Sequence, residues 1–202
     1  LSGVPADKLP KVLQLFNKMA TEICEGQQYD VDFESQEHVT IEEYLKMIRL
    51  KTSVLLANAL QTGAYIAGAD DQAQETLYQF GINIGLAFQI QDDILDVWGD
   101  PKTFGKAVGG DISYNKKTFV YLEAKRRGGE RLEEWYSQVL EDNTEKIAAV
   151  KEIFEQLEVR AVCEKVVEDY TQKALALLDQ LPQNEATEQL RQLANKLTTR
   201  KD

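Results

Sequence analysis

Apolar side chains recur every three or four residues along almost the whole chain, a spacing that places them on one face of an α-helix. No stretch alternates apolar and polar residues for long enough to predict a β-strand. A chain of 202 residues is long enough to bury one sizeable core. The pattern therefore predicts an all-α protein that forms a single helical domain over residues 1–202.

Capping residues and turns divide this pattern into separate helices. Gly26 is expected to end the first helix, which begins near residue 6, and the acidic residues 29–39 are expected to form a loop. Thr40 and Glu43 have the spacing of a capping box and open a second helix, whose apolar residues surround so much of it that we expect it to be largely buried. This second helix is expected over residues 40–67. Further helices are expected over residues 71–98, 117–127, 130–141, 143–156, 158–181 and 184–200.

The chain is strongly acidic, with 23 Lys and Arg against 34 Asp and Glu and a net charge of −11. This balance argues against a protein that binds the phosphates of nucleic acids. An anionic ligand must instead be held by a local cluster of cations or by a bridging metal ion. No apolar run approaches the roughly 20 residues of a membrane span, so we expect no stable insertion into a membrane.

The few histidines and cysteines exclude several kinds of site. His38 is the only histidine and is expected to be exposed, which argues against histidine-based zinc sites and against Ser-His or Cys-His catalysis. Cys24 and Cys163 lie in apolar helical patterns, so we expect two reduced, buried thiols. The first residues have neither the charged start nor the apolar core of a signal peptide. We therefore expect a cytoplasmic protein.

Three carboxylates lie close together in the third helix. Asp92 and Asp96 are four residues apart and share a face, with Asp93 beside them, and their neighbours are apolar. A divalent cation would relieve both the repulsion between these acids and the cost of burying them. Ligation by oxygen alone favours Mg²⁺, and Gly81 and Gly85 on the same row would let a ligand or another helix come close. The alternative is a solvent-exposed acidic patch whose spacing is coincidental.

Lysines are expected near the same place. Lys51 lies midway along a mostly apolar helix, where its charge must reach water, a carboxylate or an anionic ligand. A Gly-rich segment without clear helical periodicity follows the acidic helix and contains Lys102, Lys106, Lys116 and Lys117. We expect it to fold as a lid over an anion that the metal holds, although an ordinary exposed loop is the alternative. Together the acids and lysines predict a diphosphate in an apolar cavity.

Several strings of residues resemble the C-terminal two-thirds of the trans-isoprenyl diphosphate synthases, the polyprenyl synthetase family. They are GQQYD at residues 26–30, Lys51-Thr52, FQIQDDILD at residues 88–96, Gly105-Lys106, and Gly110-Asp111-Ile112 with Asn115-Lys116. Their order and separations fit the family over essentially the whole chain. The resemblance implies a helical bundle of the isoprenoid-synthase type around a central cavity, without its N-terminal helices, and a homodimer.

The resemblance also implies an activity. Members of this family join an allylic diphosphate to isopentenyl diphosphate head-to-tail, while Mg²⁺ ions bridge the allylic diphosphate to two aspartate-rich motifs. Loss of the diphosphate leaves a carbocation, which the isopentenyl double bond attacks before a proton is lost. By this resemblance Asp92 ligates Mg²⁺ directly, and Asp93 and Asp96 support it.

Further residues acquire roles from the same resemblance. The substrate-binding residues that it implies are Gln27, Lys51, Phe88, Gln89, Lys106 and Lys116. Among these, the lysines hold the diphosphate and Phe88 lines the allylic tail. The catalytic residues that it implies are Lys51, Thr52 and Gln89, because Thr52 and Gln89 place oxygen dipoles near the carbocation.

One part of the family pattern does not occur in this sequence. The first aspartate-rich motif, its adjoining arginine pair and the upstream isopentenyl-binding basic residues are absent, and the chain does not start with Met. We therefore expect a truncated chain that is inactive alone because it holds half of the metal site. One alternative is a non-catalytic subunit that contributes half a pocket to a hetero-oligomer. A terpene cyclase of the same fold is another, although the lysines after DDILD favour chain elongation.

Overall fold

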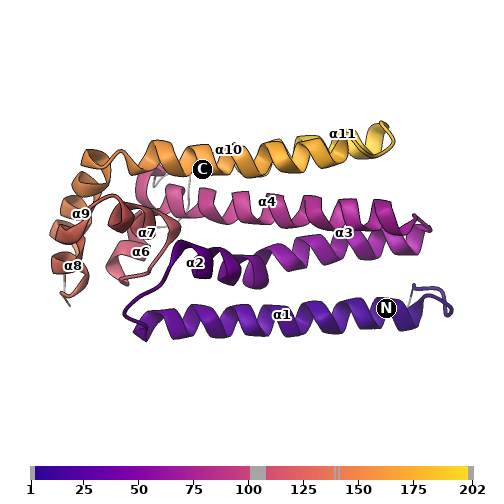
Figure 1. The fold of residues 1–202 in the computed structure, drawn as a ribbon, viewed down its shortest axis with the longest axis horizontal. Coiled ribbons are helices and arrows are strands. Elements are labelled where there is room, and N and C mark those ends of the chain that lie inside the picture. Colours follow the sequence, from indigo (N-terminus) through magenta and orange to yellow (C-terminus); the bar gives the residue numbers. More distant parts are fainter. Residues whose placement is uncertain (1–2, 101–107, 139, 141, 200–202) are drawn as a thin grey trace.

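The computed structural model describes residues 3–100, 108–138, 140 and 142–199, and these residues form helices joined by loops, with no β-strand among them. The all-α prediction is therefore confirmed. The long helices lie side by side in an elongated bundle, and the short helices gather at one end of it (Figure 1). This arrangement leaves the acidic end of the central helix next to the short helices.

The first helix is longer than the sequence pattern predicts. α1 (Leu9–Ser35) continues through Gly26 and through most of the expected acidic loop. Gly26 is buried against the backbone of Leu50 and Lys51, so closely that a Cβ atom at this position would collide with it. The prediction of a helix end at Gly26 was therefore wrong, since this glycine serves the close approach of a neighbouring segment.

The predicted second helix is present but interrupted. It consists of α2 (Ile41–Ile48), a turn of π-helix η1 (Arg49–Ser53) and α3 (Val54–Ala67). The capping box is confirmed, because the Thr40 hydroxyl accepts a hydrogen bond from the Glu43 backbone nitrogen at 3.1 Å and the Glu43 carboxylate accepts one from the Thr40 backbone nitrogen at 2.8 Å. The segment is less buried than expected, since Leu55 is 51% exposed.

The central element of the bundle is α4 (Asp71–Trp98), which packs against α3 and against a later helix, α10 (Val159–Leu178). Its buried residues include Ile90 and Ile94, which belong to the main hydrophobic core. A Cβ atom at Gly81 or at Gly85 would lie 2.5 Å from a Cα atom of α3 or η1. The close approach expected at these two glycines is therefore made by another helix rather than by a ligand.

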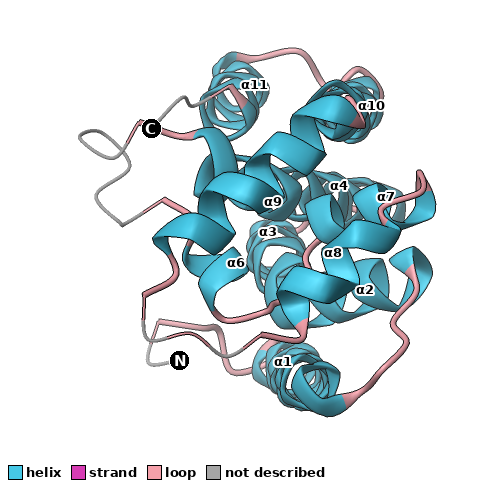
Figure 2. Ribbon diagram, turned by 90° about the vertical axis from the view of Figure 1, so that its left-hand side faces the viewer, coloured by secondary structure: helices cyan, strands magenta, loops and turns pink. Residues whose placement is uncertain are grey.

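The remaining helices follow the predicted order, apart from the short helix α6, which lies in a segment where the sequence predicted no helix. The short ones at the end of the bundle are α6 (Gly110–Ser113), α7 (Phe119–Arg126), α8 (Glu130–Tyr136) and α9 (Thr144–Gln156). The chain then returns along α4 through α10 and turns into α11 (Glu185–Thr198), which packs beside α10 (Figure 2). The short helices close the end of the bundle at which α4 finishes.

The predictions for the histidine and the two cysteines were confirmed only in part. His38 is exposed, as expected, with 79% of its side chain accessible. Both cysteines are free thiols, but only Cys163 is buried, because Cys24 lies on the outer face of α1. Within the described part of the chain, no helix has the length and apolar character needed to cross a membrane.

Candidate active site

A cavity of about 430 Å³ lies where the C-terminal part of α4 meets α1, α2, η1 and α6. Its wall combines apolar side chains such as Phe33 and Met47 with an unusual concentration of charge. The charged residues in this wall are Asp30, Glu34, Lys51, Asp92, Asp93, Asp96, Asp111, Lys116 and Lys117. All three acids of the predicted acidic turn therefore face one cavity, together with two of the lysines that were expected to bind diphosphate.

Asp93 is the most deeply buried acid of the acidic turn, and its contacts explain how it is accommodated. One oxygen, Oδ2, accepts a hydrogen bond from the Tyr44 hydroxyl at 2.6 Å and another from the Phe119 backbone nitrogen at 3.0 Å. Burial raises the pKa of Asp93 to about 8, even though both hydrogen bonds favour the charged form. Asp93 thus connects α4 to α2 and α7.

Asp96 connects the same helix to the start of α6. Its Oδ2 atom accepts a hydrogen bond from the Asp111 backbone nitrogen at 3.0 Å, and its carbonyl oxygen accepts one from the Gly109 backbone nitrogen at 2.6 Å. Burial, together with the charge of Asp111, raises the pKa of Asp96 to about 6. Asp92, one turn before Asp96, lines the cavity and is half-buried.

Two lysines of the cavity, Lys51 and Lys116, are held in ion pairs. The Lys51 ammonium lies 2.6 Å from a carboxylate oxygen of Asp30, and the Lys116 ammonium lies 2.9 Å from one of Asp111. Burial opposes the charge of Lys116, but the hydrogen bond to Asp111 and the surrounding acids outweigh it and raise its pKa. Lys51 therefore reaches a carboxylate, one of the three partners that the sequence left open.

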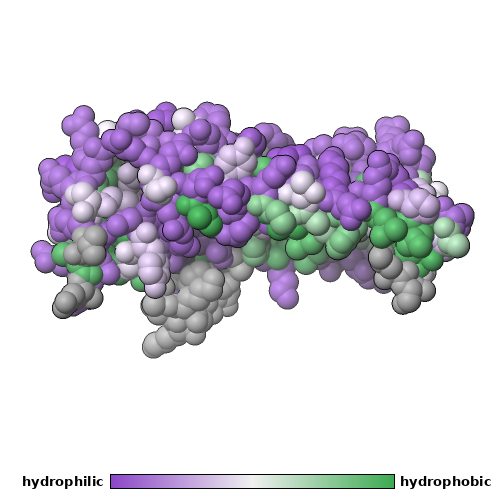
Figure 3. Space-filling model, turned by 90° about the horizontal axis from the view of Figure 1, so that it is seen from below, coloured by the Kyte–Doolittle hydropathy of each residue, from purple (hydrophilic) through white to green (hydrophobic). Residues whose placement is uncertain are grey.

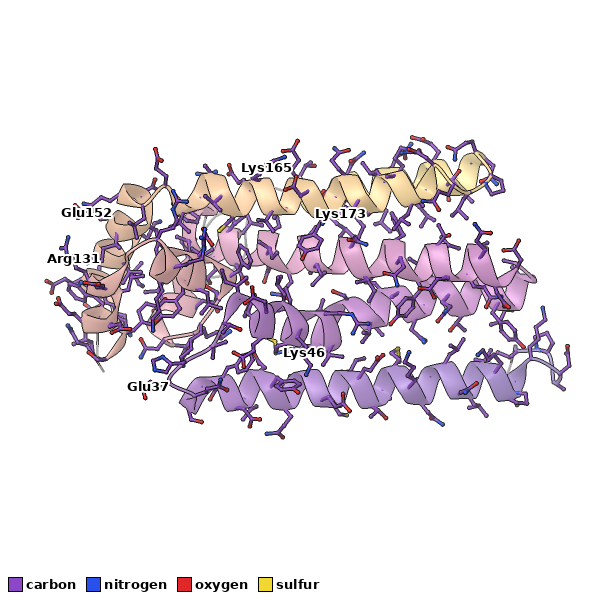
Figure 4. All side chains as sticks on the ribbon, viewed as in Figure 1. Glu37, Lys46, Arg131, Glu152, Lys165 and Lys173 are labelled. Carbon is purple, nitrogen blue, oxygen red and sulfur yellow. The ribbon has the colours of Figure 1, made fainter. Side chains whose placement is uncertain are left out.

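Two neighbouring lysines serve other contacts. Lys117 donates a hydrogen bond to the Phe33 carbonyl oxygen at 2.7 Å, which ties the segment after α6 to α1. Lys46 lies between α2 and α1, where its ammonium donates to the Tyr29 hydroxyl at 2.7 Å (Figure 4). These contacts bring α1 and α2 together beside the cavity.

The π-helical turn η1 contains two of the predicted catalytic residues, Lys51 and Thr52. A π-helical turn carries an extra residue in the helix and is often found at functional sites. The Thr52 hydroxyl donates to the Gln89 side-chain oxygen at 3.3 Å, so residues from η1 and α4 meet beside the cavity. Gln89 lines the cavity wall.

Not every predicted site residue lies in this wall. Gln27 is exposed on α1 and Phe88 is half-buried on α4, and neither is among the described residues that line the cavity. Lys102 and Lys106, and with them the part of the expected lid over residues 101–107, lie outside the described residues. The structure thus brings together Lys51, Gln89, Lys116 and the acidic turn, with Thr52 adjacent.

The donor set of the cavity suits a hard divalent cation. In the described part of the chain, no group of three or more acids, histidines or cysteines is arranged to enclose a metal ion by itself. Asp92, Asp96 and Asp111 nevertheless offer only oxygen donors. Mg²⁺ fits such a site, because it usually keeps several waters and phosphate oxygens and takes few ligands from the protein.

The comparison with protein-family models decides the family. The model described as polyprenyl synthetase matches residues 2–157. The chain belongs to the polyprenyl synthetase family. The resemblance inferred from the sequence motifs is therefore confirmed.

Relatives of the chain support the same assignment. The geranylfarnesyl diphosphate synthase of Natronomonas pharaonis is 37% identical over 199 residues, which are 98% of this chain and 58% of the relative. A crystal structure of a geranylgeranyl pyrophosphate synthase is 45% identical, with a TM-score of 0.91 over 98% of this chain and 63% of that protein.

A second solved structure carries ligands. It is a geranylgeranyl pyrophosphate synthase from Corynebacterium glutamicum complexed with isoprenyl diphosphate and magnesium, 31% identical, with a TM-score of 0.88 over 98% of this chain and 57% of that protein. These similarities confirm the isoprenoid-synthase type of all-α fold. The chain spans about three fifths of the length of the relatives that it matches.

Sequence reasoning missed several polar residues of this cavity. Asp30 and Asp111 stand in the strings that carry the resemblance, so their position beside Lys51 and Lys116 was a usable signal. Tyr44 had no such signal, because an aromatic residue at helical spacing is indistinguishable from an ordinary core residue. Its hydroxyl became informative only once Asp93 was located beside it.

Proposed function

We propose that the protein is a prenyltransferase that joins an allylic diphosphate to isopentenyl diphosphate head-to-tail. The observation that supports this most directly is the single cavity in which the acids of α4 meet Lys51 and Lys116. A diphosphate needs cations to neutralise it, and this strongly acidic chain supplies them locally. The names of the matched relatives, which are diphosphate synthases, support the same activity.

In this proposal the lysines bind the diphosphate and stabilise it as it leaves. Lys51 and Lys116 neutralise the negative charge that accumulates on the diphosphate when the C–O bond breaks. Lys106 has the same role by sequence resemblance. Thr52 and Gln89, which are hydrogen-bonded to each other, present oxygen dipoles toward the developing carbocation. The role of Phe88 beside the allylic tail and the role of Gln27 in substrate binding are inferred from the sequence resemblance alone.

We further propose that Asp92 ligates Mg²⁺, supported by Asp93 and Asp96. The support is the all-oxygen donor set of the cavity wall. When bound, Mg²⁺ supplies positive charge that neutralises the leaving diphosphate. Asp93 acts by holding α4 in position through Tyr44 and the Phe119 backbone, and Asp96 by holding the loop at Gly109 to Asp111.

The proposal assigns the other half of the metal site to residues outside these 202. No second cluster with the DDxxD spacing occurs in the sequence. The chain alone is then expected to bind diphosphate without turning over substrates. The alternative is a non-catalytic subunit that completes its pocket with a different chain. Adding a segment that carries a second aspartate-rich motif restores turnover in the first case and not in the second.

Binding is tested with inorganic pyrophosphate and this chain. We expect pyrophosphate with Mg²⁺ to raise the melting temperature, because a ligand at a hundredfold excess over its Kd stabilises by about 2.7 kcal/mol. With EDTA in place of Mg²⁺ the stabilisation is expected to vanish. Equal stabilisation in both conditions would exclude a metal bridge, and no stabilisation in either would exclude the diphosphate site.

Turnover tests the role of Asp92. In a form of the protein that converts allylic and isopentenyl diphosphates, Asp92→Ala is expected to lower turnover at least ~100-fold, because a ligand of the metal at the leaving group is lost. Asp100→Ala, a change of an exposed acid after the same helix, is the matched control. Wild-type rates in Asp92→Ala would refute the metal role.

We also propose that the protein forms a homodimer. The support is exposed apolar surface on neighbouring helices, at Leu13 and Phe16 of α1 and Leu55 of α3. Seen from the side of α1, apolar residues gather along one edge of the molecule (Figure 3). The cytoplasmic location stays a prediction from the sequence.

A further inference from the structure

Lys146 on α9 is fully buried, with 0% of its surface exposed. An ammonium group in such a place is rare, because removing it from water costs several kcal/mol unless polar partners replace the water. Lys146 is not part of the cavity wall described above. Its burial therefore needs a separate explanation.

The contacts of the Lys146 ammonium lead toward the segment after α6. It donates a hydrogen bond to the side-chain oxygen of Asn115 and lies 3.4 Å from the Gln138 carbonyl oxygen. It also lies 5.5 Å from the centre of the Tyr136 ring, which stacks on Tyr121. The aromatic pair and the carbonyl oxygen hold the ammonium, and Asn115 is the only one of these partners that belongs to the cavity wall.

Asn115 has a left-handed backbone next to a cavity lysine. Its φ angle is +55°, a conformation that asparagine adopts more readily than most residues other than glycine. The backbone nitrogen of Asn115 donates to the Ile112 carbonyl oxygen at 3.1 Å, and that of Lys116 donates to the Asp111 carbonyl oxygen at 2.9 Å. This turn directs the Lys116 side chain to its ion pair with Asp111.

The residue after Lys146 supports the other end of the same loop. Gly109 has a φ angle of +86°, and a Cβ atom there would lie 2.8 Å from a side-chain carbon of Ile147. The Gly109 backbone nitrogen donates to the Asp96 carbonyl oxygen at 2.6 Å. Two consecutive residues of α9 thus contact the two ends of the segment from Gly109 to Lys116, which contains α6.

We propose that Lys146 is a positioning residue, which holds Asn115 in its left-handed conformation and thereby keeps the Lys116 ammonium at the diphosphate cavity. A neutral side chain of similar length at position 146 would leave the Asn115 oxygen without its donor. The inference rests on the proposed function, since it assumes that Lys116 binds diphosphate.

Calorimetric titration of the chain with inorganic pyrophosphate in Mg²⁺ tests the inference. Lys146→Met is expected to weaken the affinity about tenfold, the effect of losing one charge-assisted hydrogen bond to the ligand. In a Lys116→Met background the same change is expected to have no further effect. Lys151→Met, on the same helix and outside the cavity wall, is the matched control and should bind as the wild type does.

Amide hydrogen exchange without ligand provides a readout that does not depend on diphosphate. The amides of Asn115 and Lys116 are expected to exchange faster in Lys146→Met than in the wild type or in Lys151→Met. If Lys146→Met does not fold, Asn115→Gly replaces it, because glycine keeps the left-handed backbone and removes the acceptor. Asn115→Gly is then expected to weaken pyrophosphate binding to the same extent.

The two measurements separate the inference from the function on which it rests. If the wild type does not bind pyrophosphate, the proposed function fails, while faster exchange in Lys146→Met still supports the contact with Asn115. Unchanged affinity together with unchanged exchange overturns the inference. Lower stability alone, with the affinity and the exchange at the loop both preserved, assigns Lys146 a purely structural role and also overturns it.

Discussion

Asp93 and Tyr44 illustrate how single side chains build the wall of the cavity. Asp93 is 4% exposed, and the Tyr44 hydroxyl, itself in a 4% exposed residue, donates to it across the contact between α2 and α4. Burial and the neighbouring carboxylate raise the pKa of Tyr44 well above its usual value, so the phenol keeps its proton and remains a donor. This pair removes Asp93 from solvent and leaves Asp92 as the proposed direct metal ligand.

Replacing Tyr44 tests this contact. Tyr44→Phe is expected to lower the free energy of unfolding by about 1–3 kcal/mol, because the buried Asp93 carboxyl loses a hydrogen bond. Urea denaturation measures the change. Tyr114→Phe removes a hydroxyl from a residue that is 81% exposed and serves as the control, with an expected change near zero. Equal stability of both variants would show that the Tyr44 hydroxyl does not support Asp93.

Helix packing around α4 depends on glycines that allow backbones to touch. Gly81 faces Ala57 of α3, Gly85 faces Ser53 of η1, and Gly26 of α1 faces the backbone of Lys51 from the other side. The π-helical turn is therefore enclosed by glycine contacts on both flanks. We infer that these contacts fix the position of Lys51 and Thr52 relative to α4.

Adding one methyl group at such a contact tests its importance. Gly85→Ala is expected to lower the free energy of unfolding by about 1–3 kcal/mol or more, because the new Cβ would lie 2.5 Å from the Ser53 Cα and the helices would have to move apart. The matched control is Gly63→Ala on α3, where nothing lies within 4 Å of a new Cβ. There alanine should stabilise the helix by about 0.5–1 kcal/mol. If thermal unfolding showed both variants to be more stable than the wild type, the close contact between Gly85 and Ser53 would be contradicted.

The molecule as a whole carries a net charge of −11, yet it exposes large apolar side chains on two packed helices. Phe16 of α1 is 51% exposed, and so is Leu55 of α3. Polar residues cover much of the remaining surface seen from the side of α1 (Figure 3). Apolar groups concentrated in this way favour association of two copies over an isolated chain.

Light scattering coupled to size-exclusion chromatography tests the proposed dimer. The wild type is expected to elute with the mass of two chains, and Phe16→Glu with the mass of one, because a carboxylate would have to be desolvated in the interface. Leu193→Glu changes a residue that is 48% exposed on α11 and should leave the dimer intact. A monomeric wild type, or a dimeric Phe16→Glu, would contradict the proposal.

The features that could be predicted from the sequence are local ones. The order of the helices and the capping box at Thr40 follow from side chains within a few turns of one another. The acidic turn on α4 and Lys51 in the preceding helical segment were recognisable for the same reason. Their joint position in one cavity was inferred from their charge and burial taken together, and the family resemblance supported it.

What the sequence by itself determined is the all-α class, the family and the presence of the acidic turn, because residue spacing and motif order carry that information. Only the tertiary structure decided that α1 continues through Gly26, that Asp93 faces Tyr44 and that Lys146 reaches Asn115. Each of these depends on a partner that lies 20 or more residues away along the chain. A local pattern contains no record of which distant backbone or side chain will pack against it, so burial and pairing are settled only when the helices meet.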